Sequence, residues 1–472
     1  MADVTPLLSM AGLAGYLAIA YVIGALLAGL VTAAPGGILR ATSPILGGSA
    51  LAIQLWIYGA VHVPWNPLTL LIPWVVVVGL RRSRLRRAIT ADWLGAVAEA
   101  RRIIGAGALS VVFCVTLVGI AFLYLLNLVT QPVLGWDAIA MWLFKAGVYY
   151  AQQAVNLAPI ATEVRRNLDY PPLYTLMVDS LYALNGGVDE IFGKSVTYLF
   201  FVSGIAGFYV MARDLLGRQL AITFTFVVAA TPIFLKALFD FQYMGWADYP
   251  FAILMLVSLL HFLDGLRSGD SVSYALSIVF AALSAFTKNE GLTFLAIMLL
   301  VVGITYARAI AQRTSRFVPD WKLVAVVALG VAPLIAWRVY LQLQGIQTAR
   351  VLGDESLSLL PGLPNRTVAV LREIRSLASL KLDYPWLAVS FALSLVLVTF
   401  SRARDGWLVL IVIGLQIAAY FYVYLTAPFD VQYIVSTTFD RLTLQLTPSI
   451  VLLLAIAIHP YVTAEASRRV AD

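Results

Sequence analysis

Apolar runs of bilayer length recur from one end of this chain to the other, and this recurrence limits the possible folds more than any other feature. A helix needs about 17 to 25 mostly apolar residues to cross a membrane. The runs do not alternate polar and apolar residues, as the strands of a membrane barrel do. Only 12% of the 472 residues are charged, against about 25% in a soluble domain. The sequence therefore predicts an all-α polytopic membrane protein.

The apolar runs predict about 13 transmembrane helices, joined by short loops and by juxtamembrane helices on the outer face. The first run lacks a basic region before it and a small-residue cleavage site after it, so we expect a retained helix and no signal peptide. A single cysteine, Cys114, excludes a disulfide framework within the chain. The expected spans are 9–32, 45–62, 66–80, 104–129, 191–212, 219–236, 249–266, 272–287, 291–307, 322–341, 384–401, 406–425 and 442–460.

Clusters of arginine decide the predicted orientation in the membrane. All of them fall on the cytoplasmic side if the N-terminus is outside, the C-terminus is inside, and the segment 171–186 does not cross. Pro171 and Pro172 suit the start of a helix and Gly186 its end, so we interpret this segment as a juxtamembrane or re-entrant helix. The net charge of +7 then reflects loops that attract membrane lipids, and no nucleic-acid partner is expected.

Three regions follow from the pattern of spans and loops. Residues 1–103 form an N-terminal membrane extension with the basic cytoplasmic loop RRSRLRR. Residues 104–320 form a membrane core that contains the first outer loop, 130–190, and residues 321–472 form a C-terminal membrane region with an outer loop at 342–383. Repeats of 20 to 50 residues and low-complexity tracts are absent from the sequence.

The stretch WDAIAMW places an acid, Asp137, between Trp136 and Trp142 at the start of the first outer loop. Tryptophan and tyrosine favour the headgroup level, so we expect helices that lie along the outer surface. A carboxylate between apolar rings loses part of its hydration, which raises its pKa and makes it a stronger base. The alternative is that Asp137 only caps a helix.

Two further acids and a lysine lie at outer helix ends. Asp248 directly precedes an expected span, where it either serves a substrate or caps the helix, with Pro250 in the first turn. In TKNEG, Lys288 is placed to bind a phosphate, with Glu290 to orient it. The alternative for Lys288 and Glu290 is an ordinary ion pair at a helical hairpin.

Arg441 lies outside, against the general trend of positive charge on the inside, and this position favours a contact with a phosphate. Alternatively, its side chain snorkels to the interface or pairs with Asp440. The three histidines, His62, His261 and His459, are scattered, and no spacing of His, Asp or Glu predicts a metal site.

These motifs occur in a recognisable order. WDAIAMW and DYPPLY, then ATPIFLKALFDFQYMGWADYPF, then SAFTKNEGL resemble the GT-C glycosyltransferases, in particular the branch of protein O-mannosyltransferases and aminoarabinose transferases. The resemblance covers about residues 104–310, and residues 320–460 are similar in pattern only. It implies a GT-C-like enzyme of a prokaryotic inner (plasma) membrane. Such an enzyme transfers a sugar from a polyprenyl-phosphate donor to a hydroxyl of a lipid, glycan or protein, usually with inversion, on the outer face.

The resemblance also implies roles for single residues. Asp137 matches the general base, Asp248 the second outer acid that positions acceptor or donor, and Lys288 the phosphate-binding lysine. The family's L-T-K-G-type motif reads TKNEG here, so the geometry at the phosphate is expected to differ. We expect no required cofactor, because the first loop lacks the acid-x-acid pair of metal-using relatives, although a divalent metal stays possible. Further substrate-binding candidates are Glu290, Arg441, Lys145 and Tyr170.

Two other classes of protein stay open. A transporter or lipid flippase would place ionisable residues near mid-span at broken helices, whereas the expected spans are almost free of charge there. A polysaccharide ligase or polymerase that uses lipid diphosphates would carry arginines in a large outer loop. The loop 342–383 offers Arg350, Arg366, Arg372 and Arg375.

Overall fold

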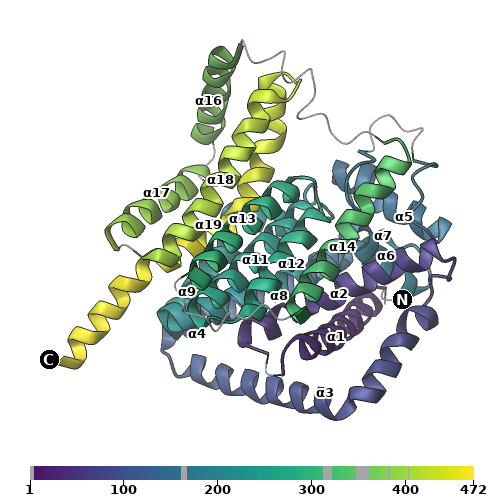
Figure 1. The fold of residues 1–472 in the computed structure, drawn as a ribbon, viewed down its shortest axis with the longest axis horizontal. Helices are drawn as coiled ribbons and strands as arrows, with labels where there is room; N and C mark the ends of the chain where they lie inside the picture. Colours follow the sequence, from purple (N-terminus) through teal and green to yellow (C-terminus); the bar gives the residue numbers. More distant parts are fainter. Residues whose placement is uncertain are drawn as a thin grey trace.

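The structure is a computed structural model that describes residues 5–33, 35–160, 167–311, 321–346, 362–380, 383–401 and 403–471. Within these ranges all regular secondary structure is helical, and strands are absent. The helices pack into one body in which several long helices run side by side (Figure 1). The prediction of an all-α chain is confirmed for this part of the protein.

The first half of the chain forms eleven of these elements, including one π-helix. They are α1 (Thr5–Val31), α2 (Gly37–Ala60), α3 (Pro67–Ile104), α4 (Ala108–Thr130), the π-helix η1 (Ala138–Trp142), α5 (Leu143–Gln152), α6 (Leu173–Asn185), α7 (Glu190–Lys194), α8 (Thr197–Leu216), α9 (Arg218–Ala230) and α10 (Pro232–Phe239). The rest are α11 (Asp248–Ser268), α12 (Ser271–Ala285), α13 (Glu290–Ala311), α14 (Trp321–Leu343), α16 (Leu363–Leu380), α17 (Asp383–Ser401), α18 (Arg404–Thr426) and α19 (Val431–Ala471).

Nine helices of the described part are long and apolar enough to cross a membrane, or ten spans if α9 and α10, which meet at a bend of 57°, count as one. This supports an integral membrane protein but not 13 spans. α12 has only 15 residues, and α2 is not among the nine. The expected span 66–80 is the first part of α3, a helix of 38 residues that continues through RRSRLRR along the lower edge of Figure 1.

The segment that we expected not to cross forms α6. It has 13 residues, which correspond to about 20 Å of helix, too short for a hydrocarbon layer of about 30 Å. Pro172 precedes it, and Gly186 ends it with a φ of 77°, a conformation that glycine adopts at little cost. Residues Leu173 to Ala183 are all buried. α6 is therefore a short internal helix, which agrees with the expectation that this segment does not cross the membrane.

Ion pairs gather the arginine clusters at one end of the molecule. Arg40 of α2 contacts Asp92 of α3 at 2.9 Å, and Arg218 of α9 contacts Glu99 of α3 at 3.0 Å. Arg267 and Asp405 approach to 3.8 Å at the same end. Asp248 lies at the other end of α11 from Arg267, about 30 Å away along the helix. The structure thus separates the two sets of charges, and which end faces the cytoplasm stays a prediction.

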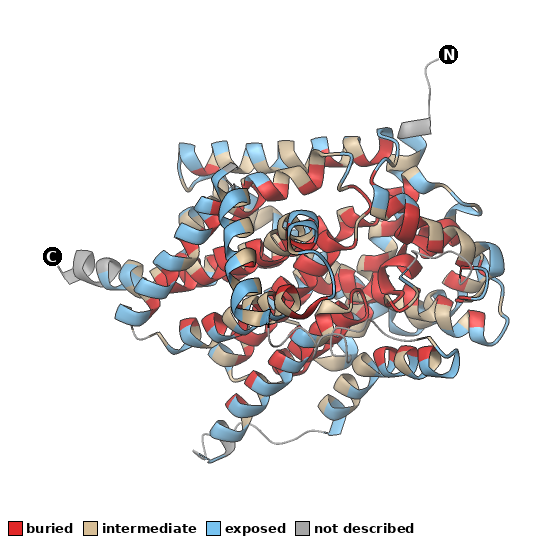
Figure 2. Cartoon of the chain, turned by 90° about the horizontal axis from the view of Figure 1, so that it is seen from above, coloured by how far each residue is buried: buried red, intermediate tan, exposed pale blue. Residues whose placement is uncertain are grey.

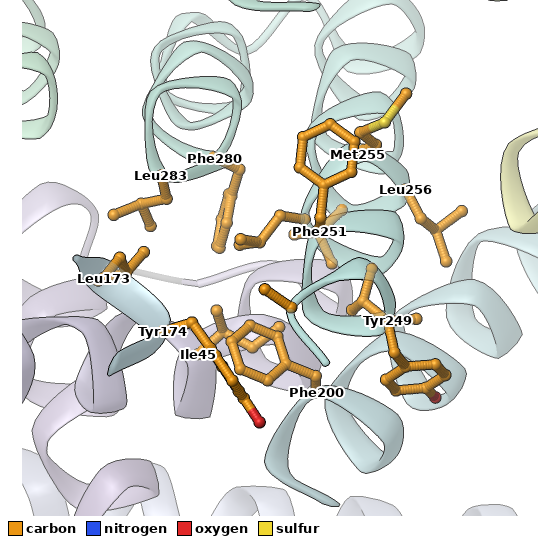
Figure 3. Close-up of a cluster of buried hydrophobic side chains, with 14 of the residues drawn as sticks. Ile45, Leu173, Tyr174, Phe200, Tyr249, Phe251, Met255, Leu256, Phe280 and Leu283 are labelled. Carbon is orange, nitrogen blue, oxygen red and sulfur yellow. The ribbon is translucent and has the colours of Figure 1, made fainter. Parts of the chain in front are cut away.

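One continuous apolar core, from Leu13 in α1 to Ala457 in α19, holds the helices together. Its centre is α11, whose residues are buried nearly throughout. Figure 2 shows that buried residues concentrate in the middle of the molecule. Figure 3 shows Phe251 and Met255 of α11 near Phe280 of α12. α1 and α2 approach so closely that a Cβ on Gly24 would overlap the backbone oxygen of Ser43, a mode of packing that small residues permit between membrane helices.

Candidate functional site

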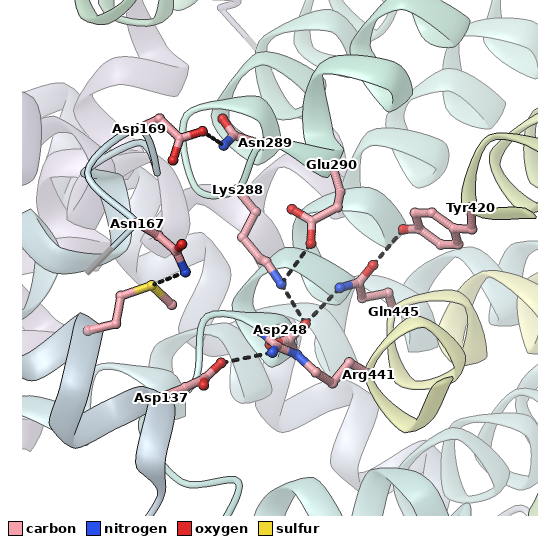
Figure 4. A network of polar contacts seen from close by, with 11 residues as sticks. Asp137, Asn167, Asp169, Asp248, Lys288, Asn289, Glu290, Tyr420, Arg441 and Gln445 are labelled. Atoms are coloured by element: carbon pink, nitrogen blue, oxygen red, sulfur yellow. Dashed lines mark hydrogen bonds and ion pairs between the residues drawn. The ribbon is translucent and has the colours of Figure 1, made fainter. Parts of the chain in front are cut away.

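Asp248, the first residue of α11, is the centre of a buried polar network (Figure 4). Its carboxylate is fully buried and does not cap the helix, so the capping alternative is wrong. It accepts hydrogen bonds from Lys288 Nζ at 2.7 Å, Arg441 Nη2 at 3.0 Å and Gln445 Nε2 at 2.7 Å. Two cations and an amide thus compensate the loss of hydration that burial imposes on this charge.

Lys288 lies in the turn between α12 and α13, with 1% of its side chain exposed. Its ammonium contacts Asp248 and, at 3.1 Å, Glu290 Oε1, so the expected ion pair at this hairpin exists within a larger cluster. It also lies 6.0 Å from the centre of the Tyr170 ring. Glu290 is 27% exposed, and its second oxygen has no hydrogen-bond partner. Of the partners of Lys288, Glu290 is therefore the less firmly held.

Arg441 comes from α19 and joins the two acids of the network. Its Nε and Nη2 donate to one oxygen of Asp248, at 3.1 and 3.0 Å, and its Nη1 lies 2.9 Å from Asp137 Oδ2. The guanidinium carbon lies 5.0 Å from the centre of a Trp246 ring. Asp440, its neighbour in sequence, instead pairs with Lys236 at 2.9 Å. The expected pairing of Arg441 with Asp440 is therefore wrong.

Asp137 directly precedes η1, yet its side chain forms no capping hydrogen bond. The capping alternative is therefore wrong for this residue as well. Its Oδ2 lies within ion-pair distance of Arg441 Nη1, but this oxygen accepts no hydrogen bond. About a fifth of the side chain, 19%, is exposed. Close packing fixes this loop, since a Cβ on Gly135 would overlap the backbone oxygen of Gln242.

The network carries a formal excess of negative charge. Its three carboxylates are Asp137, Asp248 and Glu290, and its two cations are Lys288 and Arg441, which leaves one negative charge. An anionic ligand would be repelled by an excess of carboxylates. A phosphate therefore fits only where it takes the place of a carboxylate beside a cation.

Tyr170 lies beside this network, whereas Lys145 does not join it. The charge of Glu290, together with burial, raises the pKa of Tyr170 well above its usual value, so the phenol stays protonated. Lys145 is 1% exposed and donates to the backbone oxygen of Asn167 at 2.6 Å. Burial lowers its pKa to about 7, although the charge of Asp169 opposes this shift. Lys145, which we expected among the substrate-binding residues, therefore forms no ion pair with the carboxylates of the network in the described part of the chain.

Sequence reasoning missed several neighbours of the site. Asn289 donates to Asp169 at 2.8 Å and accepts from Arg338 at 2.9 Å. The sequence holds a signal for two of them. Arg338 is a charge within an apolar run, and Gln445 follows Arg441 by four residues, which places both on one face of α19.

The rings of the first outer loop, which we expected at the headgroup level, are mostly buried within the protein. Trp142 and Tyr149 are fully buried, and Trp142 packs edge-on against Tyr170 with ring centres 5.5 Å apart. Only Trp136, with 74% exposed, has the accessibility of an interfacial anchor among these three. The rings of this loop therefore belong mainly to the core.

No group of three or more His, Cys, Asp or Glu side chains in the described ranges is placed to hold a metal ion. The expectation that the protein requires no metal stays a prediction. Much of the outer loop 342–383, including 347–361 with Arg350, lies outside the described residues. Arg366 of that loop donates to the backbone oxygens of Tyr424, Ala427 and Phe429, which does not favour a role in binding a lipid diphosphate.

Comparison with protein-family models, curated proteins and solved structures finds no significant match to this chain. The family resemblance therefore rests on the sequence motifs alone.

Proposed function

We propose that this chain is a GT-C-type glycosyltransferase that moves a sugar from a polyprenyl-phosphate donor to a hydroxyl of a lipid, glycan or protein acceptor. The observation that supports this most is the convergence of Asp137, Asp248, Lys288 and Arg441, which are far apart in sequence. Glycosyl transfer needs a base beside the acceptor hydroxyl and cations beside the leaving phosphate. The network contains both kinds of group.

In the proposed reaction, Asp137 accepts the proton of the acceptor hydroxyl, and the acceptor oxygen attacks the anomeric carbon of the sugar. The bond from this carbon to the phosphate oxygen breaks, and the phosphate leaves with the electron pair. Arg441 and Lys288 stabilise the charge on the leaving group. Attack opposite the leaving phosphate inverts the anomeric carbon. The proton ends on the Asp137 carboxylate, which returns it to water.

The charge of the network suggests how the donor enters. Glu290 touches Lys288 at 3.1 Å and is partly exposed, and Asp137 touches Arg441 at 2.9 Å. We infer that the donor phosphate displaces both carboxylates from these cations, which leaves Asp137 free to act as a base. Asp248 is fully buried and stays bound to both cations. Its role is then to position Lys288 and Arg441 rather than to contact the acceptor.

A transporter is the second candidate, and one observation favours it. α9 and α10 meet at a bend of 57°, and Lys236 of α10 pairs with Asp440 next to Arg441. Transporters often bind substrates at such broken helices. However, Asp248 lies at the end of α11 and not in its middle, and transporter sites lie near the membrane midplane. Chemistry at a membrane surface therefore explains the site better.

The test is Asp137→Asn in the purified full-length protein, assayed for sugar transfer from a polyprenyl-phosphate sugar in proteoliposomes. Loss of a general base lowers the rate by about 10² to 10⁴-fold. Donor binding should be retained or strengthened, because the substitution removes the carboxylate that competes with the phosphate for Arg441. Asp240→Asn is the matched control, because Asp240 caps the backbone N–H of Gln242 in a loop. Full transfer by the Asp137 variant would remove it from the mechanism. Movement of a solute without transfer in the wild type would favour the transporter.

A further inference from the structure

A cavity lies at the arginine-rich end of the molecule, opposite the Asp248 network. It has a volume of about 530 Å³ and is enclosed by the end of α1, the start of α2 and the middle of α3. Figure 1 shows α3 passing beneath α1 in this region. Pockets that hold small ligands have volumes of about 300 to 1,000 Å³, so this cavity has the size of a binding site.

The cavity is apolar inside and cationic at its edge. Its walls include Leu26, Leu30, Val77 and Leu85. The charged residues that line it are four arginines and one acid: Arg40, Arg81, Arg84, Arg87 and Asp92.

The single acid that lines the cavity, Asp92, already has two hydrogen-bond donors. Asp92 accepts from Arg40 Nη1 at 2.9 Å and from the hydroxyl of Tyr21 at 2.5 Å. In the described part of the chain, Arg81 and Arg84 form no ion pair, and both are exposed. Two guanidinium groups at the cavity edge are thus available to an anion, which arginine binds through several parallel N–H groups.

The spacing along α3 directs these arginines to the cavity. Arg81, Arg84, Ala88 and Ala91 all line it, and their separations of three and four residues place them on one face of a helix. Arg82 and Arg86 belong to the same basic run but do not line the cavity. The polybasic segment is therefore divided between one face that meets an apolar cavity and another that does not.

We propose that this cavity binds one anionic phospholipid from the membrane leaflet at this end of the molecule. The phosphate lies between Arg81 and Arg84, and the first part of an acyl chain lies against Leu26, Leu30 and Val77. An apolar interior beneath a cationic edge matches an amphipathic anion. A basic pocket between membrane helices binds lipid head groups by the same physics. This inference does not depend on the proposed glycosyl transfer.

The experiment compares two variants of equal charge in the full-length protein. The detergent-purified chain is incubated with phosphatidylglycerol or phosphatidylcholine, and retained lipid is counted by native mass spectrometry. We expect the wild type to prefer phosphatidylglycerol at least fivefold. R81Q/R84Q should lose this preference, and R82Q/R86Q should retain it within twofold. Equal losses in both variants would show diffuse attraction to the polybasic run and overturn the site.

Two further arms test the apolar cavity and the source of the phosphate. Gly29→Phe fills the cavity while every arginine remains, because a Cβ on Gly29 has no heavy atom within 4 Å. It should lower retention of phosphatidylglycerol at least fivefold, and unchanged retention would contradict the acyl-chain contact. Millimolar inorganic phosphate should not displace the lipid. Full displacement would assign the site to a free anion instead. Gel filtration and thermal unfolding show whether each variant is folded.

Discussion

The two polar ends of this molecule use similar side chains in opposite ways. At the Asp248 end, Lys288 and Arg441 are largely enclosed, and each contacts two carboxylates. At the arginine-rich end, Arg81 and Arg84 are exposed, and no acid in the described part of the chain pairs with them. A buried charge requires a partner because it has lost its hydration, whereas an exposed one is stabilised by water.

The two ends are therefore suited to different tasks. The buried network holds its cations in fixed positions, and the exposed arginines attract anions. The enclosed network fixes its cations at defined distances, which chemistry on a substrate requires. The exposed arginines act on any anion nearby, and only the apolar cavity beside them makes the interaction specific. The predictions below test this contrast, from the largest expected effect to the smallest.

Asp248→Asn should have the largest effect, on stability. It removes the shared partner of Lys288 and Arg441 and leaves both cations largely buried. Breaking a buried ion pair in this way costs about 3–5 kcal/mol. Asp405→Asn removes a partly exposed pair with Arg267 at the other end, where the cost is about 0–1 kcal/mol. Thermal unfolding in detergent measures both, and equal shifts would contradict the contrast.

Lys145 should give the protein a pH-dependent stability. Its pKa is about 7 in the folded chain and about 10.4 when unfolded, so the unfolded chain binds more protons between these values. Stability therefore rises with pH across this window, by at most about 1.4 kcal/mol per pH unit. Lys145→Met should remove this rise between pH 7.5 and 9.5. Lys322→Met, an exposed lysine, should keep it, and parallel curves for wild type and Lys145→Met would refute the effect.

Glu290→Gln should strengthen binding of polyprenyl phosphate. The substitution removes the one negative charge that the network has in excess. It also replaces the carboxylate that competes with the donor phosphate for Lys288. We expect about a tenfold lower Kd, which corresponds to about 1.4 kcal/mol. Glu190→Gln is the control, because Glu190 is an exposed acid at the start of α7. Weaker binding in the Glu290 variant would mean that this acid orients the phosphate instead of competing with it.

Removal of divalent metal should have the smallest effect. Transfer activity of the purified protein should stay within twofold after treatment with EDTA, because in the proposed mechanism Lys288 and Arg441 stabilise the leaving phosphate. The measurement is the transfer rate before and after chelation. Loss of activity that returns on addition of Mg²⁺ or Mn²⁺ would show that a metal takes part.

The fold was predictable where local properties decide it. Apolar length identified the nine long helices and the bent pair, because the hydrocarbon thickness sets the length of a span. It did not determine where every helix begins and ends, because tertiary packing also affects the length of a helix. α12 crosses the apolar core with only 15 residues, and α3 continues through its arginines as one helix. Apolar runs alone cannot show where a helix continues into a polar sequence.

The members of the polar network were predictable from the sequence, but their contacts were not. Charges at apolar helix ends are few, so the sequence analysis named all five charged members of the network as site candidates: Asp137, Asp248, Lys288, Glu290 and Arg441. The sequence did not show which of these residues contact one another, and Lys145 illustrates the reason. It lies in the same outer loop as Asp137, yet its ammonium binds the backbone oxygen of Asn167 instead of joining the network. The direction of a side chain depends on what packs around it.

The sequence by itself determined a helical membrane protein with acids and a few cations at one set of helix ends and arginines at the other. These properties follow from the length and charge of local segments. Only the tertiary structure decided that Arg441 binds Asp248 and Asp137 while Asp440 binds Lys236. Adjacent residues on a helix point in different directions. Asp440 therefore meets Lys236 of α10, while Arg441 meets Asp248 of α11 and Asp137 of the first outer loop.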